Sequence, residues 1–402
     1  MSSSSERVER ALTTLKAGGL VIVTDDDQRE AEGDMVGLAQ YATAATVNQM
    51  VTHARGLLCV PLTATRATQL GLRPMVPEGT DAFGTAFTVG TDAKTTSTGI
   101  SADDRATTIR QLAATTAQPA DFYHPGHVFP LIAREHGTLE RAGHTEAAVD
   151  LAKLAGATPV AYICEILRKD GKMAHRRQLK PFAEGSQLPL LSIQDIQDYR
   201  YQRDVDVLTE IPAVALPTRY GDFRLTAYQT FDGQEPTLLI SKGPVQPGEP
   251  LLLRVHSECF TGDVLGSKRC DCGEQLQLAL QAIEAHGSGA VLYLRQEGRG
   301  IGLANKLRAY RLQEQGLDTV EANQRLGFRP DQRNYGLVAA VLHRLRVSRV
   351  ALMTNNPDKI AQLKQLGIQV ERRVPLETTP QPENRQYLKT KQQKFHHYLK
   401  EV

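Results

Sequence analysis

The chain has 402 residues, too long for one average domain, so two or three domains are expected. Its net charge of only +2 excludes a strong field that would attract nucleic acid or a membrane surface. Five cysteines, an odd number, indicate a reducing compartment rather than a disulfide framework, and no run of about 18 apolar residues occurs. We therefore expect a cytoplasmic protein without a membrane span or a nucleic-acid partner.

The N-terminal half alternates amphipathic segments with short apolar runs. A helix beginning at Ser5 as its N-cap should end at Gly18, because glycine favours helix C-termini. The expected strands cover 20–23, 57–60, 86–89 and 160–163, and a further helix covers 145–154. This alternation predicts a mixed α/β layer architecture.

An acidic loop follows the first strand, with six carboxylates between Asp25 and Asp34. A solvated loop is one interpretation. The other is a cation site, because crowded like charges repel one another and oxygen ligands suit Mg²⁺ or Mn²⁺. Histidines in glycine-flanked loops at 124–127 and 141–146 raise the odds of a site. Together these groups fit enolisation chemistry on a sugar phosphate.

The segments REAEGDM, STGISADDRATTI, HPGHVFPL and RAGHTEAAVDLAKLAG resemble 3,4-dihydroxy-2-butanone 4-phosphate synthase over about 8–199. The resemblance implies conversion of ribulose 5-phosphate to 3,4-dihydroxy-2-butanone 4-phosphate and formate, with Mg²⁺ or Mn²⁺. It implies Glu30 and His144 as metal ligands, and His127 and Glu165 as catalytic residues. Cys59 matches an active-site cysteine but fits a strand core equally well. The matched ribulose 5-phosphate positions are Arg29, Glu30, Asp34, Arg141 and Thr145.

Two residues depart from the family's acidic run, DDEDRENEGD. Gln28 replaces an aspartate and removes one charge, and Ala31 replaces an asparagine and removes a hydrogen-bonding side chain. Neither matched metal ligand is lost, so we expect the activity to be retained. The alternative is that the N-terminal domain is an inactive scaffold and that only the second half of the chain is an enzyme.

A charged, irregular stretch near 196–210 precedes Pro212 and Pro217 and predicts a boundary between two different domains in tandem, 1–204 and 205–402. The second domain should also be α/β. Its expected strands cover 223–230, 237–241, 290–295 and 350–354, and its expected helices cover 274–285, 302–315 and 335–345. The basic tail after residue 384 is interpreted as a solvated helix end.

Three cysteines of the C-terminal half, Cys259, Cys270 and Cys272, lie in a polar loop where burial as small apolar residues is unfavourable. A closed structural zinc site takes four protein ligands, whereas a catalytic one takes three and leaves a position for water. The absence of a fourth cysteine nearby therefore predicts an open, hydrolytic zinc site.

Two turns predict the substrate of this zinc site. The glycine-rich run 296–302 follows a strand and opens a helix, so its backbone N–H groups and Arg299 can bind phosphate. Lys359 begins another such helix, although a solvated lysine is equally expected there. Glu258 or Glu297 could accept hydrogen bonds from a purine. The sequence therefore predicts a zinc hydrolase acting on a phosphorylated purine.

The segments RVHSECFTGDVLGSKRCDCGEQL, YLRQEGRGIGLANKLRAY and MTNNPDK resemble GTP cyclohydrolase II over about 216–374. The resemblance implies attack at C8 of GTP with loss of formate and diphosphate, and a homodimer. It implies Asp331 as proton acceptor, Arg333 as nucleophile on the α-phosphate and Tyr310 near the substrate. Because the pKa of arginine is above about 12, we expect Arg333 to stabilise phosphoryl charge instead. A nucleotide sensor without turnover is the non-enzymatic alternative. The implied GTP-binding residues are Arg254, Val255, His256, Ser257, Glu258, Gln275, Glu297, Gly298, Arg299, Thr319, Thr354 and Lys359.

Overall fold

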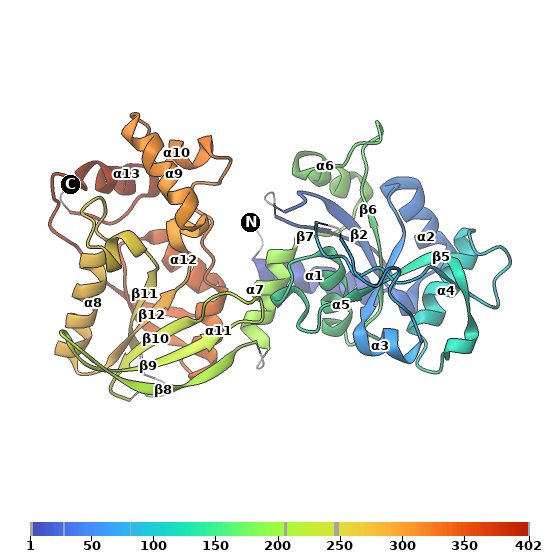
Figure 1. The fold of residues 1–402 in the computed structure, drawn as a ribbon, viewed down its shortest axis with the longest axis horizontal. Coiled ribbons are helices and arrows are strands. Elements are labelled where there is room, and N and C mark those ends of the chain that lie inside the picture. The colour runs from blue at the N-terminus through green and yellow to red at the C-terminus, as the bar shows by residue number, and fades with distance from the viewer. Residues whose placement is uncertain (1–2, 27–28, 81, 205–206, 245–248, 401–402) are drawn as a thin grey trace. The chain divides into compact units, whose positions relative to one another are not determined.

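The computed structural model describes residues 3–26, 29–80, 82–204, 207–244 and 249–400, so Gln28 lies outside the described residues. The chain forms two compact units, which we name the N-terminal unit (Met1–Arg200) and the C-terminal unit (Tyr201–Val402) (Figure 1). Each is a sheet covered by helices, as the alternating pattern predicts. Within the described part of the chain, no helix is long and apolar enough to cross a membrane.

The N-terminal unit has a seven-stranded mixed sheet in the order β4-β5-β3-β6-β2-β1-β7. Its strands pack against apolar clusters on both faces, because side chains alternate along a strand. Met35 and Val36, neighbours on β2, belong to different clusters. The strands are β1 (Val21–Thr24), β2 (Gly33–Leu38), β3 (Cys59–Thr63), β4 (Thr91–Ala93), β5 (Phe122–Ala133), β6 (Ala161–Glu165) and β7 (Leu190–Ser192).

Helices cover both faces of this sheet. Those packed in the cluster with Val36 are α1 (Ser4–Lys16), α5 (His144–Leu154) and α7 (Ile193–Arg203). Those in the cluster with Met35 include α2 (Ala44–Gln49), α3 (Ala64–Gln69), α4 (Ala102–Ala113) and α6 (Arg176–Ser186). Two expectations need correction. The cap of α1 is Ser3, which forms a capping box with Glu6. The predicted strand 86–89 makes only isolated bridges, through Phe87 and Thr88.

The C-terminal unit has a second seven-stranded sheet, in the order β14-β13-β11-β12-β10-β9-β8. Four strands at one side are parallel, and three at the other form an antiparallel meander. The parallel part places the carboxyl ends of neighbouring strands along one edge, where α/β proteins bind ligands. The strands are β8 (Thr209–Thr218), β9 (Gly221–Gln229), β10 (Thr237–Lys242), β11 (Leu251–Ser257), β12 (Gly289–Leu294), β13 (Arg349–Met353) and β14 (Gln369–Val374).

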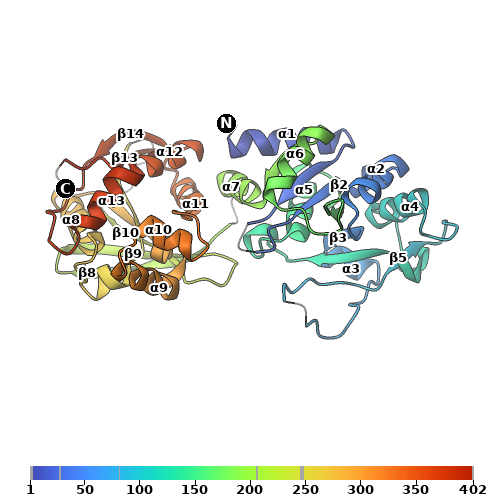
Figure 2. The ribbon, with the colours of Figure 1, turned by 90° about the horizontal axis from the view of Figure 1, so that it is seen from above.

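For one helix of the C-terminal unit, the prediction made from the sequence is wrong. They are α8 (Cys272–His286), α9 (Gly302–Glu314), α10 (Thr319–Arg325), α11 (Gly336–Arg344), α12 (Pro357–Gln365) and α13 (Arg385–Phe395). The basic tail forms α13, but it is not a solvated helix end. Leu388, Thr390 and Lys391 are buried, and α13 lies beside α10 in both views (Figures 1 and 2).

Candidate active sites

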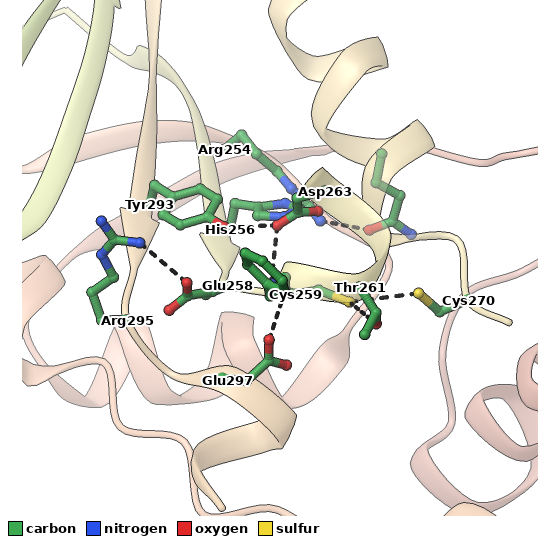
Figure 3. A network of polar contacts seen from close by, with 12 residues as sticks. Arg254, His256, Glu258, Cys259, Thr261, Asp263, Cys270, Tyr293, Arg295 and Glu297 are labelled. Carbon is green, nitrogen blue, oxygen red and sulfur yellow. Dashed lines mark hydrogen bonds and ion pairs between the residues drawn. The ribbon is translucent and has the colours of Figure 1, made fainter. Parts of the chain in front are cut away.

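The three clustered cysteines meet at the carboxyl edge of the C-terminal unit's sheet, and Figure 3 shows two of them, Cys259 and Cys270. Cys259 follows β11, Cys270 lies just before α8, and Cys272 is the first residue of α8. The Sγ atoms of Cys259 and Cys270 are 3.6 Å apart, and all three Sγ atoms lie within 4.8 Å of one another. This donor set fits a metal that prefers sulfur ligands, with zinc as the usual case.

The surroundings of the thiols favour a bound cation. A Cβ at Gly262 would lie 3.0 Å from Cys270 Sγ and 3.1 Å from Cys259 Sγ, so only glycine fits without pressing on them. Hydrogen bonds from Cys270 and Cys272, and then Lys306, hold the pKa of the Cys259 thiol far below its ordinary value. Hydrogen bonds with Cys259 and Cys270, followed by burial, raise the pKa of the Cys272 thiol. A metal would relieve this competition by letting all three thiols ionise.

Asp263, which sequence reasoning missed, organises the loop around the first cysteine. Its carboxylate accepts hydrogen bonds from the Cys259 backbone N–H at 3.0 Å and from the Tyr293 hydroxyl at 2.9 Å. It also lies 3.1 Å from Nε2 of His256, whose ring stacks on Tyr293 (Figure 3). The side chain of Asp263 thus fixes both a candidate metal ligand and a predicted GTP-binding histidine.

Glu297 and Lys306 form a second set of contacts with the loop around Cys259. The carboxylate of Glu297 accepts from the backbone N–H groups of Phe260 at 2.6 Å and Gly298 at 2.8 Å, and from Lys306 Nζ at 2.7 Å. Lys306 Nζ also lies 3.1 Å from Cys259 Sγ. With its acceptors engaged, Glu297 holds the glycine-rich turn against the cysteine loop. Glu258, which is bound only by Arg295 in Figure 3, is the more available purine acceptor.

The cysteines open into a pocket lined by most of the predicted substrate residues. Two exceptions are Val255 and Asp331, which are absent from the lining among the described residues. Val255 is fully buried, and its carbonyl accepts a 2.6 Å hydrogen bond from Lys359 Nζ. The lining includes Arg254, His256, Ser257, Glu258, Gln275, Glu297, Gly298, Arg299, Tyr310, Thr319, Arg333, Thr354 and Lys359.

The cations of this pocket are buried. Lys359 is only 4% exposed, so the solvated-lysine interpretation is wrong. Asp331 pairs with Arg333, and although burial opposes it, Tyr335 and Asp331 raise the pKa of Arg333. Arg333 therefore stays charged and suits stabilisation of a phosphate. Nη1 of Arg299 is buried with no hydrogen-bond partner in the described part of the chain.

In the N-terminal unit, the acidic loop and α5 bring together Asp25, Glu30 and His144, whose ligand atoms lie within 4.8 Å of one another. Asp25 shapes the loop, because its carboxylate accepts from the backbone N–H groups of Glu30 at 3.0 Å and Glu32 at 2.8 Å. His144 Nδ1 lies 3.6 Å from Glu30 Oε2. Sequence reasoning did not single out Asp25 as a ligand, although the acidic run contained it.

Without a bound cation, buried ionisable groups beside this cluster have shifted pKa values and polar atoms that lack a partner. Burial, opposed by His144 and reinforced by Glu165, raises the pKa of Asp34 to about 7. Burial would lower the pKa of His144, but Asp34 and Glu30 raise it to about 9. Asp34 Oδ1 and His144 Nε2 are buried and find no hydrogen-bond partner among the described residues. Carboxylate oxygens fit a divalent cation, and a cation bound here would take the place of the proton on His144.

The other predicted sugar-phosphate residues surround the same loop. Arg29 binds Glu30 at 2.6 Å. Arg141 binds Glu146 at 2.6 Å and donates to the carbonyl of Phe83 at 2.9 Å. Thr145 is buried in the first turn of α5, directly after His144. Both arginines are already paired with carboxylates and would bind a phosphate through their remaining N–H groups.

His127 forms a dyad that the sequence did not predict. Its Nδ1 lies 2.7 Å from Asp92 Oδ2, and its backbone N–H donates to Asp92 Oδ1 at 2.9 Å. With Nδ1–H directed at the carboxylate, Nε2 is left for proton transfer. Gly99 packs on this pair at φ +89°, and a Cβ there would lie 2.1 Å from Asp92 Oδ2.

Glu165 and Cys59 lie near each other but differ in character. Glu165, on β6, is paired in register with Asp34 on β2, and its Oε2 accepts from the Leu57 N–H at 2.7 Å. Cys59 is 1% exposed in β3, and burial followed by Glu165 raises the pKa of its thiol. A thiol that resists ionisation is a poor nucleophile, which favours the strand-core interpretation.

Two family models match the chain, one in each unit. The model of 3,4-dihydroxy-2-butanone 4-phosphate synthase matches residues 9–199, and that of GTP cyclohydrolase II matches residues 209–375. The relatives "Riboflavin biosynthesis protein RibBA" of Bacillus mycoides (strain KBAB4) and of Bacillus cereus (strain B4264) are each 52% identical over 98% of this chain and 99% of their own length.

A solved structure is similar across both units. It is the crystal structure of RibBX from A. baumannii, a two-domain 3,4-dihydroxy-2-butanone 4-phosphate synthase. It superposes with a TM-score of 0.68 at 32% identity and covers 93% of this chain and 100% of its own. Its two-domain α/β architecture matches the predicted fold class.

Fold and sites together define a two-domain α/β enzyme, a lyase joined to a hydrolase. The chain belongs to the RibBA family of bifunctional riboflavin biosynthesis proteins, in which a 3,4-dihydroxy-2-butanone 4-phosphate synthase domain precedes a GTP cyclohydrolase II domain. The resemblance drawn from the sequence motifs is therefore confirmed.

Proposed function

We propose that residues 1–204 convert ribulose 5-phosphate to 3,4-dihydroxy-2-butanone 4-phosphate and formate. We propose further that residues 205–402 hydrolyse GTP to 2,5-diamino-6-(5-phosphoribosylamino)pyrimidin-4-one, formate and diphosphate. One observation supports both reactions: each unit contains its own metal-competent cluster, and the two clusters differ in donor type. Carboxylates with imidazole suit the enolisation, and thiolates suit the hydrolysis.

In the C-terminal unit, Cys259, Cys270 and Cys272 would hold zinc, which would supply Lewis acidity for hydrolysis at C8 of the purine. Tyr310 lines the same pocket, with its hydroxyl 3.4 Å from Thr261 Oγ1. In this position it would orient the reacting ring. The predicted GTP residues that line the pocket would bind the nucleotide, with Glu258 at the guanine edge.

The phosphates would lie on the cationic side of the pocket. Arg333 would stabilise phosphoryl charge, and its ion pair with Asp331 supports this role rather than that of a covalent nucleophile. Asp331, held 2.9 Å from Arg333 Nε, is the proposed proton acceptor. Val255 would act through its carbonyl, which holds Lys359 in place.

In the N-terminal unit, Glu30 and His144, with Asp25 as an additional ligand, would hold Mg²⁺ or Mn²⁺. The cation would polarise the substrate's carbonyl for enolisation. Arg29, Asp34, Arg141 and Thr145 would bind ribulose 5-phosphate. Glu165 and the His127–Asp92 dyad would move protons, with Nε2 of His127 as the exchanging atom. We assign Cys59 a packing role.

The alternative, a cyclohydrolase with an inactive N-terminal scaffold, rests on Gln28 and Ala31. A scaffold would have no need of the buried carboxylate of Asp34, whose raised pKa means that its ionised form is costly in a metal-free unit. We therefore favour the bifunctional enzyme. We also propose a cytoplasmic homodimer, in keeping with apolar side chains exposed on both units, among them Val76, Phe83, Val264 and Leu265.

The decisive experiment measures formate from the purified chain with ribulose 5-phosphate and with GTP separately, before and after metal removal. Both substrates should yield formate, Mg²⁺ should restore the first reaction, and Zn²⁺ the second. Formate from GTP alone, at every Mg²⁺ and Mn²⁺ concentration, would establish the scaffold alternative. GTP binding without formate would establish a sensor.

A further inference from the structure

The C-terminal segment lies beyond the matched part of the cyclohydrolase, which ends at residue 375. Nevertheless Tyr387, Lys391 and His397 line the same pocket as the cysteines. Lys391 is 7% exposed, and lysine is almost never buried unless it is paired. The segment containing α13 is therefore a wall of the pocket rather than a solvated tail.

Lys391 ends a buried chain of polar contacts that runs behind the cysteines. Its Nζ pairs with Asp271, the residue between Cys270 and Cys272. The other oxygen of Asp271 accepts a 2.7 Å hydrogen bond from Gln275 Nε2. Gln275 Oε1 in turn accepts a 2.5 Å hydrogen bond from Arg254. The buried carboxylate of Asp271 thus interacts with two cations. It pairs directly with Lys391, and it contacts Arg254 through the side-chain amide of Gln275.

This arrangement leaves positive charge in excess. Burying a cation without a matching anion is costly, so an anionic ligand is expected to complete the site. The same positive charge affects His397: burial, followed by the charges of Lys391 and Arg333, lowers the pKa of this histidine to about 2. Arg299 lines the same pocket and adds to the excess, and burial, followed by Arg254 and Arg333, lowers the pKa of Lys359.

Lys391 is not needed to keep α13 in place. Lys394, one turn further on, pairs with Asp318 and Glu321 of α10. Beyond the helix, the backbone N–H of Tyr398 donates to the carbonyl of Asn355 at 2.8 Å. These contacts dock the segment in addition to the Lys391–Asp271 pair, so the position of α13 does not depend on Lys391 alone.

We propose that Lys391 is a specificity-determining residue that binds the phosphate chain of the nucleotide, and that Asp271 is the positioning residue that aims it into the pocket. The proposal rests on the proposed cyclohydrolase function and extends its phosphate site to a helix outside the matched region. It predicts that the contribution of Lys391 depends on the ligand's phosphates and not on its base.

The test is Lys391→Met in the full-length, zinc-loaded protein, with titration calorimetry of inorganic tripolyphosphate and of guanosine, neither of which is the hydrolysed nucleotide. Loss of one charge-assisted hydrogen bond should weaken tripolyphosphate binding roughly tenfold to a hundredfold. Guanosine binding and zinc content should not change, and KM for GTP should rise in the same proportion as the tripolyphosphate dissociation constant. An equal loss for guanosine and tripolyphosphate would overturn the proposal.

Two further variants separate binding from packing. Lys389→Met makes the same change on the same helix at a side chain outside the described pocket lining, and it should bind tripolyphosphate like the parent. Lys391→Met leaves the buried carboxylate of Asp271 without its ion-pair partner and should lower the melting temperature. The double variant Lys391→Met with Asp271→Asn removes both charges of the pair, so it should regain thermal stability but not tripolyphosphate binding. Recovery of binding in the double variant would reduce Lys391 to a structural partner. If the parent protein hydrolyses no GTP yet binds tripolyphosphate, only the proposed function fails.

Discussion

The two sites hold their candidate metal ligands in different ways. In the C-terminal unit, the ligands lie at the ends of regular elements, with Cys259 after β11 and Cys272 opening α8. In the N-terminal unit, His144 is fixed at the start of α5, but Glu30 belongs to a loop shaped by hydrogen bonds to Asp25. A site on helix and strand ends is positioned more precisely than one on a loop.

The two sites also differ in the charge of the ligand that each would bind. The N-terminal cluster crowds carboxylates, which raise the pKa of Asp34 after burial, and so it is complementary to a cation. The C-terminal pocket gathers buried cations beside its thiols, and so it is complementary to a metal and an anion together. The charge of each site is therefore complementary to that of its proposed ligand. Either activity can also serve as an internal control when the other site is changed.

The largest expected effect comes from removing one ligand at each site. Cys270→Ser should reduce GTP hydrolysis to background, because a hydroxyl binds zinc far more weakly than a thiolate. His144→Ala should do the same to formation of the four-carbon phosphate, because it removes the imidazole ligand of the acidic cluster. Formate release from each substrate, measured on both variants, gives the result.

The crossed pattern is the informative part of this test. Each variant should keep the other activity at the level of the parent chain, and metal analysis should show loss of only zinc or only the magnesium-type ion. Equal loss of both activities in either variant would mean that the units do not act independently.

A smaller effect is expected from Asp92→Asn, which leaves the metal ligands intact. The amide removes the carboxylate oxygen that accepts from Nδ1 of His127 and orients its ring, so kcat for ribulose 5-phosphate should fall about a hundredfold with little change in KM. Asp92→Glu should recover part of the loss. A parallel rise in KM, or lost GTP hydrolysis, would indicate general disruption instead of a role in proton transfer.

Much of this organisation is predictable from local pattern. Glycine-flanked alternation of helices and strands located most elements, and the spacing of Cys259, Cys270 and Cys272 located the thiolate cluster. Their grouping is short-range, because one loop and one helix start contain all three. The acidic loop was visible for the same reason.

The missed residues act over long sequence separations. Asp92 meets His127 across 35 positions, and Lys391 meets Asp271 across 120. No local signal distinguishes these side chains from surface charges, and the basic composition of the tail pointed to solvent. Only the fold decides that Lys391 is buried, because α13 packs Leu388, Thr390 and Lys391 into the interior of the unit.

The acid stability of the N-terminal unit should depend on Asp104. Its carboxylate accepts from the hydroxyl and backbone N–H of Ser97 and from the N–H of Gly99, which lowers its pKa to about 2. Because the folded pKa lies below the ordinary value of 3.8, its stabilising contribution is present above about pH 4 and is lost as the pH falls toward about 2. Asp104→Asn should unfold with a weaker pH dependence in that window, monitored by thermal melts. An identical dependence in both proteins would contradict this.

The smallest expected effect concerns Ala31, one of the positions at which the acidic loop differs from the family's sequence. Ala31 adopts φ +57°, a left-handed conformation that asparagine and glycine tolerate better than alanine, and its carbonyl is held 2.8 Å from His175 Nδ1. The alanine therefore strains the backbone, beyond removing a hydrogen-bonding side chain. Ala31→Asn and Ala31→Gly should each stabilise the loop; for Asn the gain is expected to be about 0.5–1 kcal/mol, measured as a higher melting temperature.

The two variants separate the interpretations of this position. If backbone strain is the cause, Asn and Gly should raise Mg²⁺ affinity alike, because both relax the loop that holds Glu30. If the lost side-chain hydrogen bond matters, only Asn should do so. A large gain in four-carbon phosphate formation with Asn, from an almost inactive parent, would support the scaffold alternative, because it would mean that the natural chain lacks a group that its N-terminal chemistry requires.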